Sequence, residues 1–456
     1  MKITITALGS RGDIQPYLAL AVGLQAAGHQ VTLAAPQIFS PWIESYGVTA
    51  HAVNFDPQTF LQRPEVQAIL KSRNIFSQLR RIFKEMNEGT LQTLDDFWAA
   101  EQNADFVVAG AGGLGGAEVP SQLGIPMAYS FLWPAVATRA FPAFMLPQRA
   151  SLGGLYNYLS AEVFSRAAWP MTSKPINQWR ASRLGLPPWR SGAEMLKVCE
   201  KFNTQWLFAF SPSLLPKPPD WKEFHHVTGY WFLDPPPDWT PPPGLLNFLE
   251  SGPPPVYIGF GSMNQQDPQR TTRLALRALE LSGQRGLLLT GWGGIARMDA
   301  PANVFFADNV PHAWLFPRMA AVVHHGGAGT TAAGLRAGIP GILTPLAGDQ
   351  SAWADLVVKA GVGPRAPSMK KLTPEKLAAA ITRAVADPEM RARAAALGEK
   401  IRAEDGISRA IEVIEGHVLN HHPNKDIPST KNTAASNASI QPNPIDPYLR
   451  ILGVHS

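Results

Sequence analysis

The stretch that decides the fold is AAVVHHGGAGTTAAGLRAGIPGILTP, residues 320–345. It begins with an apolar run of strand length, continues through a glycine-rich loop into small residues that suit a helix, and ends on a second apolar run. A strand, a helix and a strand in this order predict two parallel strands in a sheet that helices cover on both faces.

The loop in this stretch has the composition of an anion-binding site. Gly326, Gly327 and Gly329 allow the backbone to approach a ligand closely. The following helix directs its N-terminal N–H groups and the positive end of its dipole at the loop. Thr330 adds a hydroxyl donor, and His325 can donate to the same anion. The pattern favours a phosphate or diphosphate ligand over a purely structural turn.

The same residues also fit a nicotinamide-cofactor site. The segment Gly327–Ala332 matches G-x-G-x-x-A, and Asp349 lies 20 residues beyond Gly329. Four residues, PLAG, separate Asp349 from its strand, and Gln350 follows it. A carboxylate–carboxamide pair suits the several hydroxyls of a sugar at least as well as one ribose. A role for Asp349 as a helix cap is a further alternative.

The alternation of strands and helices runs through both halves of the chain. It opens with MKITITALGS, which indicates a first strand and not a signal peptide, and a helix over 17–27 with Pro16 at its first position. The segment DPPPDWTPPPG, residues 234–244, is the clearest boundary, because proline runs form semi-rigid spacers. We therefore expect an acceptor-binding domain over 1–234, a proline-rich linker over 235–255, a donor domain over 256–405, a helix over 406–420 that packs back toward the N-terminal domain, and a polar, disordered tail over 421–456.

A second candidate loop, GSRGD, follows the first strand. Ser10 and Arg11 can reach an anion, and Asp13 stands at the carboxyl end of the strand, where open α/β sheets bind ligands. Asp13 can act as a general base for an incoming hydroxyl, although helix capping is its alternative. The loop Gly259–Ser262 occupies the corresponding place in the second half.

Composition excludes several classes of protein. A hydrophobic content of 45% excludes wholesale disorder, and a net charge of +5 is too weak to indicate a nucleic-acid partner. The single cysteine, Cys199, excludes a disulfide within the chain, and no paired aspartates suggest a metal site. No apolar run reaches the length of a membrane span, so we expect a cytoplasmic protein and leave peripheral membrane contact open.

Residues 131–235 contain seven of the 13 tryptophans. Such density predicts either an ordinary core, an apolar pocket for an acceptor or a membrane-facing surface. Phe131 and Trp133 are the candidate acceptor-binding residues.

These motifs carry a resemblance to a known family. The run from Val310-Pro-His312 through residues 322–345 to Asp349-Gln350 resembles the donor-binding signature of UDP-sugar-dependent glycosyltransferases with the GT-B fold. The most similar branch contains sterol 3-β-glucosyltransferases and glycopeptide-antibiotic glycosyltransferases. GSRGDIQP is similar to the opening motif of that branch, and GFGSM to its interdomain motif. The resemblance implies two Rossmann-like domains that face a cleft.

The resemblance also implies roles for individual residues. Asp13 would deprotonate the acceptor hydroxyl, and the helix start after His325 would stabilise the departing diphosphate without a metal ion or a further cofactor. The donor would be a UDP-sugar, expected to be UDP-glucose, and the acceptor a lipophilic alcohol such as a sterol, another terpenoid or a polyketide. The donor-binding residues would be Ser10, Arg11, Gly12 and Ser262 near the phosphates, Val310 at the uracil, His325, Gly327, Gly329 and Thr330 at the diphosphate, and Asp349 and Gln350 at the hexose.

The sequence departs from the plant-type signature of these enzymes. Gly326, Ala328 and Gly329 stand where that branch carries Cys, Trp and Asn, and Asp13 lies in the region of its catalytic histidine. Two readings from other classes remain open: an oxidoreductase that uses a nicotinamide cofactor, and a catalytically silent sugar-nucleotide-binding partner protein.

Overall fold

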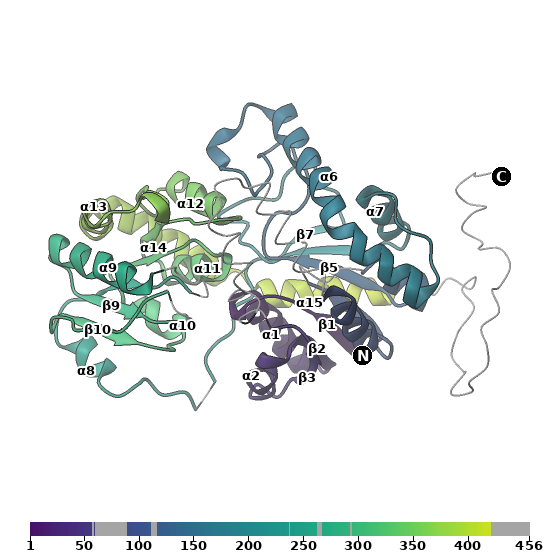
Figure 1. The fold of residues 1–456 in the computed structure, drawn as a ribbon, viewed down its shortest axis with the longest axis horizontal. Coiled ribbons are helices and arrows are strands. Elements are labelled where there is room, and N and C mark those ends of the chain that lie inside the picture. The colour runs from purple at the N-terminus through teal and green to yellow at the C-terminus, as the bar shows by residue number, and fades with distance from the viewer. Residues whose placement is uncertain are drawn as a thin grey trace. The chain divides into compact units, whose positions relative to one another are not determined.

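The computed structural model describes residues 1–56, 59, 89–110, 116–236, 238–261, 267–291 and 294–420. Within them the chain forms two separate parallel sheets, each flanked by helices (Figure 1). The predicted α/β class with two parallel sheets is therefore confirmed. The predicted tail, residues 421–456, lies outside the described residues.

The N-terminal sheet has seven strands in the order β3-β2-β1-β4-β5-β6-β7. At the centre of the sheet, Ile3 of β1 pairs with Val31 of β2 on one side and with Phe106 of β4 on the other. The strand order reverses between β1 and β4, and their carboxyl ends lie side by side there. The strands are β1 (Lys2–Thr6), β2 (Gln30–Pro36), β3 (Thr49–Val53), β4 (Phe106–Ala109), β5 (Met127–Phe131), β6 (Gln205–Phe208) and β7 (His225–Val227).

The helices of this half include α1 (Arg11–Ala26), α2 (Ser40–Glu44), α6 (Gly154–Trp179) and α7 (Gly192–Lys201). The expectation that Pro16 opens the first helix is wrong, because α1 begins at Arg11 and contains Pro16 in its interior. The cause is a capping box in which Ser10 and Asp13 satisfy the first turn. Pro16 has no N–H, so it gives no hydrogen bond to the carbonyl of Gly12.

The C-terminal sheet has five strands in the order β10-β9-β8-β11-β12. Its strand order reverses between β8 and β11. Its strands are β8 (Val256–Ile258), β9 (Gly286–Leu289), β10 (Val304–Ala307), β11 (Ala321–His324) and β12 (Gly341–Leu343). The helices are α8 (Leu245–Glu250), α9 (Pro268–Ser282), α10 (His312–Leu315), α11 (Ala328–Ala337), α12 (Gln350–Lys359), α13 (Pro374–Ala386), α14 (Pro388–Ala403) and α15 (Gly406–Asn420).

The segment expected to be a plain proline-rich linker contains a helix. In α8, Leu245 and Phe248 are buried, and Leu245 packs in one hydrophobic cluster with Tyr257 and Leu287 of the C-terminal sheet. Apolar residues three positions apart lie on one face of a helix, which explains why α8 docks there. This part of the segment therefore belongs to the core of the C-terminal half.

Helix α15 packs on the N-terminal half of the molecule. Its Ala410 and Ile414 are fully buried in the cluster that contains β1 and α1. Trp231 donates a hydrogen bond from Nε1 to the carbonyl of Gly406 over 3.1 Å. A methyl group added at Gly23 of α1 would lie 2.3 Å from Ile407, so the two helices are in close contact.

The aromatic segment between β5 and the linker is largely core. Trp206 stacks on Phe131 with ring centroids 5.4 Å apart, and Trp221 lies 4.5 Å from Phe208. The cluster reaches the C-terminal half through Phe144, whose ring meets Trp353 of α12 edge to face at 4.8 Å. Most of this aromatic surface therefore serves packing.

Candidate active site

Loops at the carboxyl ends of β1, β8 and β11 form the candidate site. Each of these strands lies where the strand order of its sheet reverses. Open α/β sheets bind ligands at such points, because neighbouring loops diverge there and leave the ends of the strands accessible.

The first turns of α1 and α11 meet at this point. A methyl group added at Gly329 would lie 3.6 Å from the carbonyl oxygen of Gly12, which is ordinary contact distance. Nearby, Arg11 donates from Nη1 to Oδ1 of Asn309 over 3.0 Å. Two loops that are about 300 residues apart in sequence are therefore brought together, with two helix N-termini beside each other.

The carboxylate of Asp13 is held in a defined orientation. Its Oδ2 accepts hydrogen bonds from Ser10 N at 2.7 Å and from Ser10 Oγ at 2.8 Å. Burial raises the pKa of the Asp13 carboxyl, while the two bonds from Ser10 oppose that rise. Gly9 makes the arrangement possible, because its φ is +135° and a methyl group there would lie 2.6 Å from Oδ2. A raised pKa makes Asp13 a stronger base when it is ionised.

The start of α11 presents unpaired donors. Gly327 caps the helix, so the N–H groups of the three following residues have no partner within the helix. The first intrahelical bond is from Thr331 N to the carbonyl of Gly327, over 3.0 Å. Thr331 turns its hydroxyl back to the same carbonyl, whereas Thr330 makes no hydrogen bond to a described residue. These donors are available to an anion.

His325 lies between two glycine-containing loops. A methyl group added at Gly327 would lie 2.6 Å from Nε2, and one added at Gly261 would lie 3.0 Å from Cε1. Burial lowers the pKa of His325 to about 4, so the ring is neutral at physiological pH. Its Nδ1 is buried without a hydrogen-bond partner among the described residues. A neutral imidazole can donate one hydrogen bond and accept another.

Asp349 and Gln350 stand at the start of α12. Asp349 is the N-cap residue but makes no capping bond, and its Oδ2 instead accepts a hydrogen bond from Trp353 Nε1 at 2.7 Å. Burial raises the pKa of Asp349 to about 6, and the charge of Asp13 contributes to the rise. Gln350 Oε1 accepts from Leu346 N at 2.8 Å. The capping alternative for the Asp349 side chain is therefore wrong.

The loop after β10 differs in detail from what the resemblance implies. The side chain of Val310 is 3% exposed and packs in the cluster with Leu315 and Phe316, so it is not accessible to a uracil ring. Arg11 stacks over Trp42, 4.6 Å from the ring centroid, in addition to its bond to Asn309.

The remaining predicted residues lie in different settings. Phe131 packs in the aromatic cluster at the end of β5, with Trp133 6.2 Å from its ring. Ser262 lies outside the described residues. Sequence reasoning missed Asn309 and Trp353. The spacing of four residues between Asp349 and Trp353 on one helix could have indicated the second contact.

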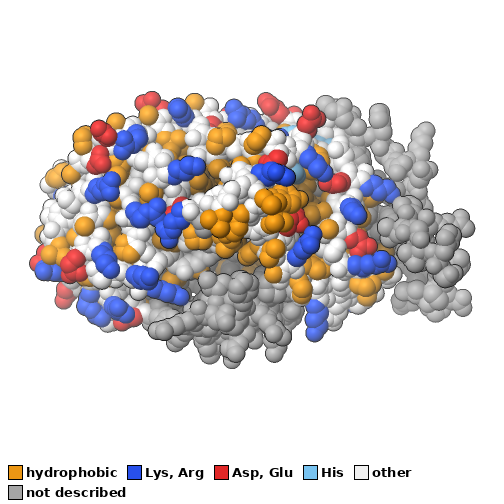
Figure 2. Space-filling view, turned by 90° about the horizontal axis from the view of Figure 1, so that it is seen from above, with side chains coloured by type: hydrophobic (Ala, Val, Ile, Leu, Met, Phe, Trp, Pro, Cys, Tyr) orange, Lys and Arg blue, Asp and Glu red, His pale blue; other side chains and the backbone are white. Residues whose placement is uncertain are grey.

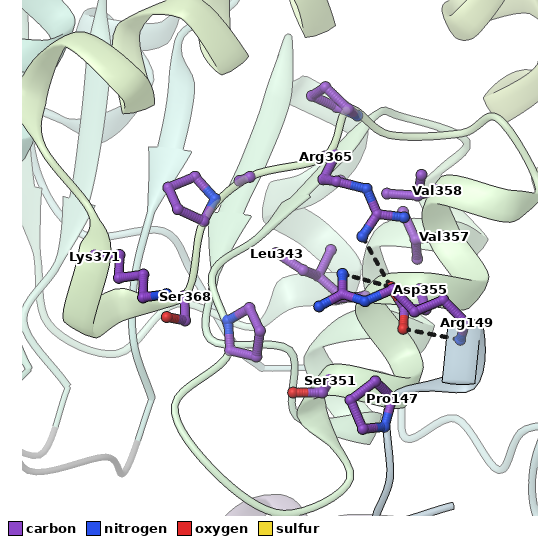
Figure 3. Close-up of a pocket in the computed structure, with 16 residues that line it drawn as sticks. Pro147, Arg149, Leu343, Ser351, Asp355, Val357, Val358, Arg365, Ser368 and Lys371 are labelled. Carbon is purple, nitrogen blue, oxygen red and sulfur yellow. Dashed lines mark hydrogen bonds and ion pairs between the residues drawn. The ribbon is translucent and has the colours of Figure 1, made fainter. Parts of the chain in front are cut away.

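A separate cavity of about 440 Å³ lies on the other side of α12 (Figure 3). Asp355 extends into it, and its Oδ1 forms ion pairs with Nη1 of Arg365 at 3.0 Å and with Nη1 of Arg149 at 3.6 Å. None of the residues predicted to bind the donor or acceptor lines this cavity.

Comparison with known proteins identifies the two halves. Residues 3–142 match the glycosyltransferase family 28 N-terminal domain, and residues 295–413 match the erythromycin biosynthesis protein CIII-like C-terminal domain. The N-terminal half is therefore similar to a glycosyltransferase domain, and the C-terminal half to a domain of an antibiotic-biosynthesis protein. Together the two matched ranges include all but one of the predicted donor-binding positions, Ser262.

Curated relatives are similar to this chain over nearly its whole length. A sterol 3-beta-glucosyltransferase of Cryptococcus neoformans is 37% identical over 439 residues, which are 91% of this chain and 27% of that protein. One from Emericella nidulans is 34% identical over 464 residues, which are 96% of this chain and 32% of that protein. The chain thus spans about a third or less of the length of these curated relatives.

Solved structures confirm the GT-B fold. The glycosyltransferase of kitacinnamycin superposes with a TM-score of 0.65 at 21% identity, covering 91% of this chain and 98% of that one. The calicheamicin glycosyltransferase CalG4 superposes with a TM-score of 0.65 at 19% identity, covering 92% of this chain and 99% of that one.

Proposed function

We propose that the protein is an inverting glycosyltransferase that moves a hexose from a UDP-sugar to a hydroxyl of a lipophilic alcohol. The observation that carries the proposal is the contact between the first turns of α1 and α11. It brings the carboxylate of Asp13 close to a helix N-terminus that has free N–H donors. A base for the acceptor and a site for the leaving group are the two requirements of this reaction.

The chemistry follows from this placement. The acceptor oxygen attacks the anomeric carbon as its proton passes to Asp13, and the bond from that carbon to the diphosphate oxygen breaks. Negative charge develops on the departing diphosphate, where the N–H groups at the start of α11 stabilise it. Because these donors and His325 carry the leaving group, we propose that the reaction needs neither a metal ion nor a cofactor.

The choice of substrates rests on the relatives and on the sugar end of the site. The curated relatives are named sterol 3-beta-glucosyltransferases, which supports glucose as the hexose and a sterol-like alcohol as the acceptor. Asp349, oriented by Trp353, is placed to accept hydrogen bonds from hexose hydroxyls. Phe131 and Trp133, at the carboxyl end of β5, are proposed to contact the acceptor.

The test is transfer by the Asp13→Asn variant. We expect kcat to fall by about 10²–10⁴-fold with the donor KM changed only a few-fold, because a general base contributes on this order. Asp405→Asn, which alters a helix-capping aspartate away from the site, serves as the control. Near-normal transfer by a folded Asp13→Asn variant would overturn the assignment of the base.

A panel of ligands separates the proposal from its alternatives. UDP and UDP-glucose should raise the melting temperature, whereas nicotinamide dinucleotides should not. Binding of UDP without transfer to any of a wide panel of lipophilic alcohols would favour a silent sugar-nucleotide-binding protein. Loss of transfer after treatment with a chelator would contradict the metal-free mechanism.

A further inference from the structure

Helix α6 carries an apolar stripe on its exposed side. Leu152, which precedes the helix, is 80% exposed, Leu155 is 64%, Leu159 is 48% and Val163 is 64% exposed. Leu155, Leu159 and Val163 are four residues apart, which places their side chains on one face of α6. Tyr158 and Phe164 widen the stripe, at 40% and 37% exposure.

The buried side of the same turns is polar. Asn157 is 3% exposed and donates from Nδ2 to the carbonyl of Arg139 over 3.0 Å. Ser160 Oγ accepts a hydrogen bond from Ala143 N at 2.9 Å. These bonds fix the rotation of the helix, so the outward direction of the leucines follows from packing. The polarity of this part of α6 is therefore the reverse of that of an ordinary surface helix.

The segment that carries the stripe has a positive net charge, with four basic residues against one acidic residue within 131–179. Glu162 is the one acidic residue within 131–179, and it pairs with Arg166 at 3.7 Å. Arg139 and Lys174 are also exposed, and the side chain of Arg166 is 82% exposed. Figure 2, which views the molecule from the α6 side, shows hydrophobic side chains gathered on this face, with Lys and Arg and also some Asp and Glu around them.

We propose that this face of α6 is a docking surface for an anionic lipid bilayer, with the leucine stripe inserted at the headgroup boundary. Apolar side chains flanked by cations have the composition of helices that lie in the interface of anionic membranes. No helix in the described ranges is long and apolar enough to span a bilayer, so the contact proposed is peripheral.

The inference rests on the proposed function, because docking would serve delivery of the acceptor. Of the proposed acceptor residues, Phe131 ends β5, and Trp133 lies with α6 in the connection from β5 to β6. A bilayer held against α6 would therefore lie at the half of the enzyme that receives the lipophilic alcohol.

The test is flotation of the full chain with vesicles of phosphatidylcholine, alone or mixed with anionic phosphatidylglycerol. The wild type should bind the mixed vesicles more strongly than the neutral ones. The double variant Leu155→Glu/Val163→Glu should lose roughly tenfold or more of that binding. The matched control is Leu281→Glu, which alters an exposed leucine of α9 and should bind like the wild type.

Two results would overturn the docking surface. One is the absence of vesicle binding by the wild type, or equal binding by the double variant. The other is a wild type that dimerises in solution and a double variant that is monomeric, which would make the stripe a contact between copies of the chain. Transfer to a water-soluble alcohol without vesicles is measured in parallel and should be the same in both proteins. Failure of that transfer alone would count against the proposed function and not against docking.

Discussion

At the scale of single residues, the sequence left two roles open for Asp13. A helix cap and a general base were alternatives for this aspartate, and the structure shows that it takes part in a capping box with Ser10. The spacing of a serine and an acid three positions later is visible in the sequence, so this partner was predictable. The nearness of Asp349 to Asp13 could not be predicted from the sequence, because it depends on how the two halves of the chain meet.

The raised pKa of Asp349 predicts a pH-dependent gain in stability for Asp349→Asn. The native carboxyl has a pKa of about 6, above its ordinary value, so the wild type loses stability as the pH rises toward 6 and the native state releases its proton. At pH 8 the variant should be more stable by ~1–2 kcal/mol, and at pH 4 the difference should be small.

Thermal melts of both proteins at the two pH values measure this difference. An equal difference in melting temperature at both values would contradict the prediction. Donor KM should rise in the variant, since Asp349 is proposed to bind the hexose.

Gly327 is a second residue whose substitution has a defined effect. A methyl group at this position would lie 2.6 Å from Nε2 of His325, so Gly327→Ala must displace the imidazole or the loop. We expect UDP to bind roughly tenfold more weakly, which corresponds to ~1.4 kcal/mol. Isothermal titration with UDP measures the change. Gly89→Ala, at a site where an added methyl group meets no atom within 4 Å, should bind UDP like the wild type.

At the scale of elements, apolar runs beside glycine-rich loops were sufficient to predict the strands that border the candidate site, but not β3, β6 or β7. The two apolar runs of residues 320–345 formed β11 and β12, with α11 between them, and the opening run formed β1. The start of α1 was wrong because a capping box outweighed the preference of proline for a first helical position. The helix within the expected linker was missed because the prolines around Leu245 and Phe248 concealed their helical spacing.

The contact between α1 and α15 yields a prediction about element packing. Gly23→Ala would place a methyl group 2.3 Å from Ile407, so α15 must shift away from the N-terminal core. We expect a loss of ~1–3 kcal/mol in the free energy of unfolding, typical of an overpacked contact. Chemical denaturation measures it.

The control for this prediction is a glycine of α15, the helix that Gly23→Ala is expected to displace. An added methyl group at Gly416 of α15 meets nothing within 4 Å. Gly416→Ala should therefore stabilise the protein by ~0.5–1 kcal/mol, because alanine is the better helix former. Equal stabilities of the two variants would show that α15 is not tightly packed on α1.

At the scale of the whole molecule, the two halves share a hydrophobic cluster. Phe144 from the N-terminal half meets Trp353 from the C-terminal half, and Trp353 in turn orients Asp349. Such pairings could not be predicted from the sequence, because they join residues more than 200 positions apart through tertiary packing alone. The aromatic density of 131–235 left a core, an acceptor pocket and a membrane-facing surface open, and it did not indicate what these residues pack against.

Phe144→Ala should weaken both the fold and the donor site. Truncation of a buried phenylalanine costs ~3–5 kcal/mol, and the freed indole of Trp353 would orient Asp349 less well. Calorimetry should show a lower melting temperature, and the donor KM should rise. Phe164→Ala, at a site 37% exposed, should leave both unchanged within error. An unchanged KM in Phe144→Ala would separate the aromatic contact from donor binding.

The return of α15 to the N-terminal half has a consequence for building hybrid enzymes. In this chain, Ala410 and Ile414 of α15 complete the core around β1. A single crossover in the proline-rich segment would replace this helix by a foreign α15 and leave residues 1–234 without the side chains that fit them. A recombinant that exchanges donor halves therefore needs two crossovers, one near residue 240 and one near Glu404, so that α15 travels with the half it covers.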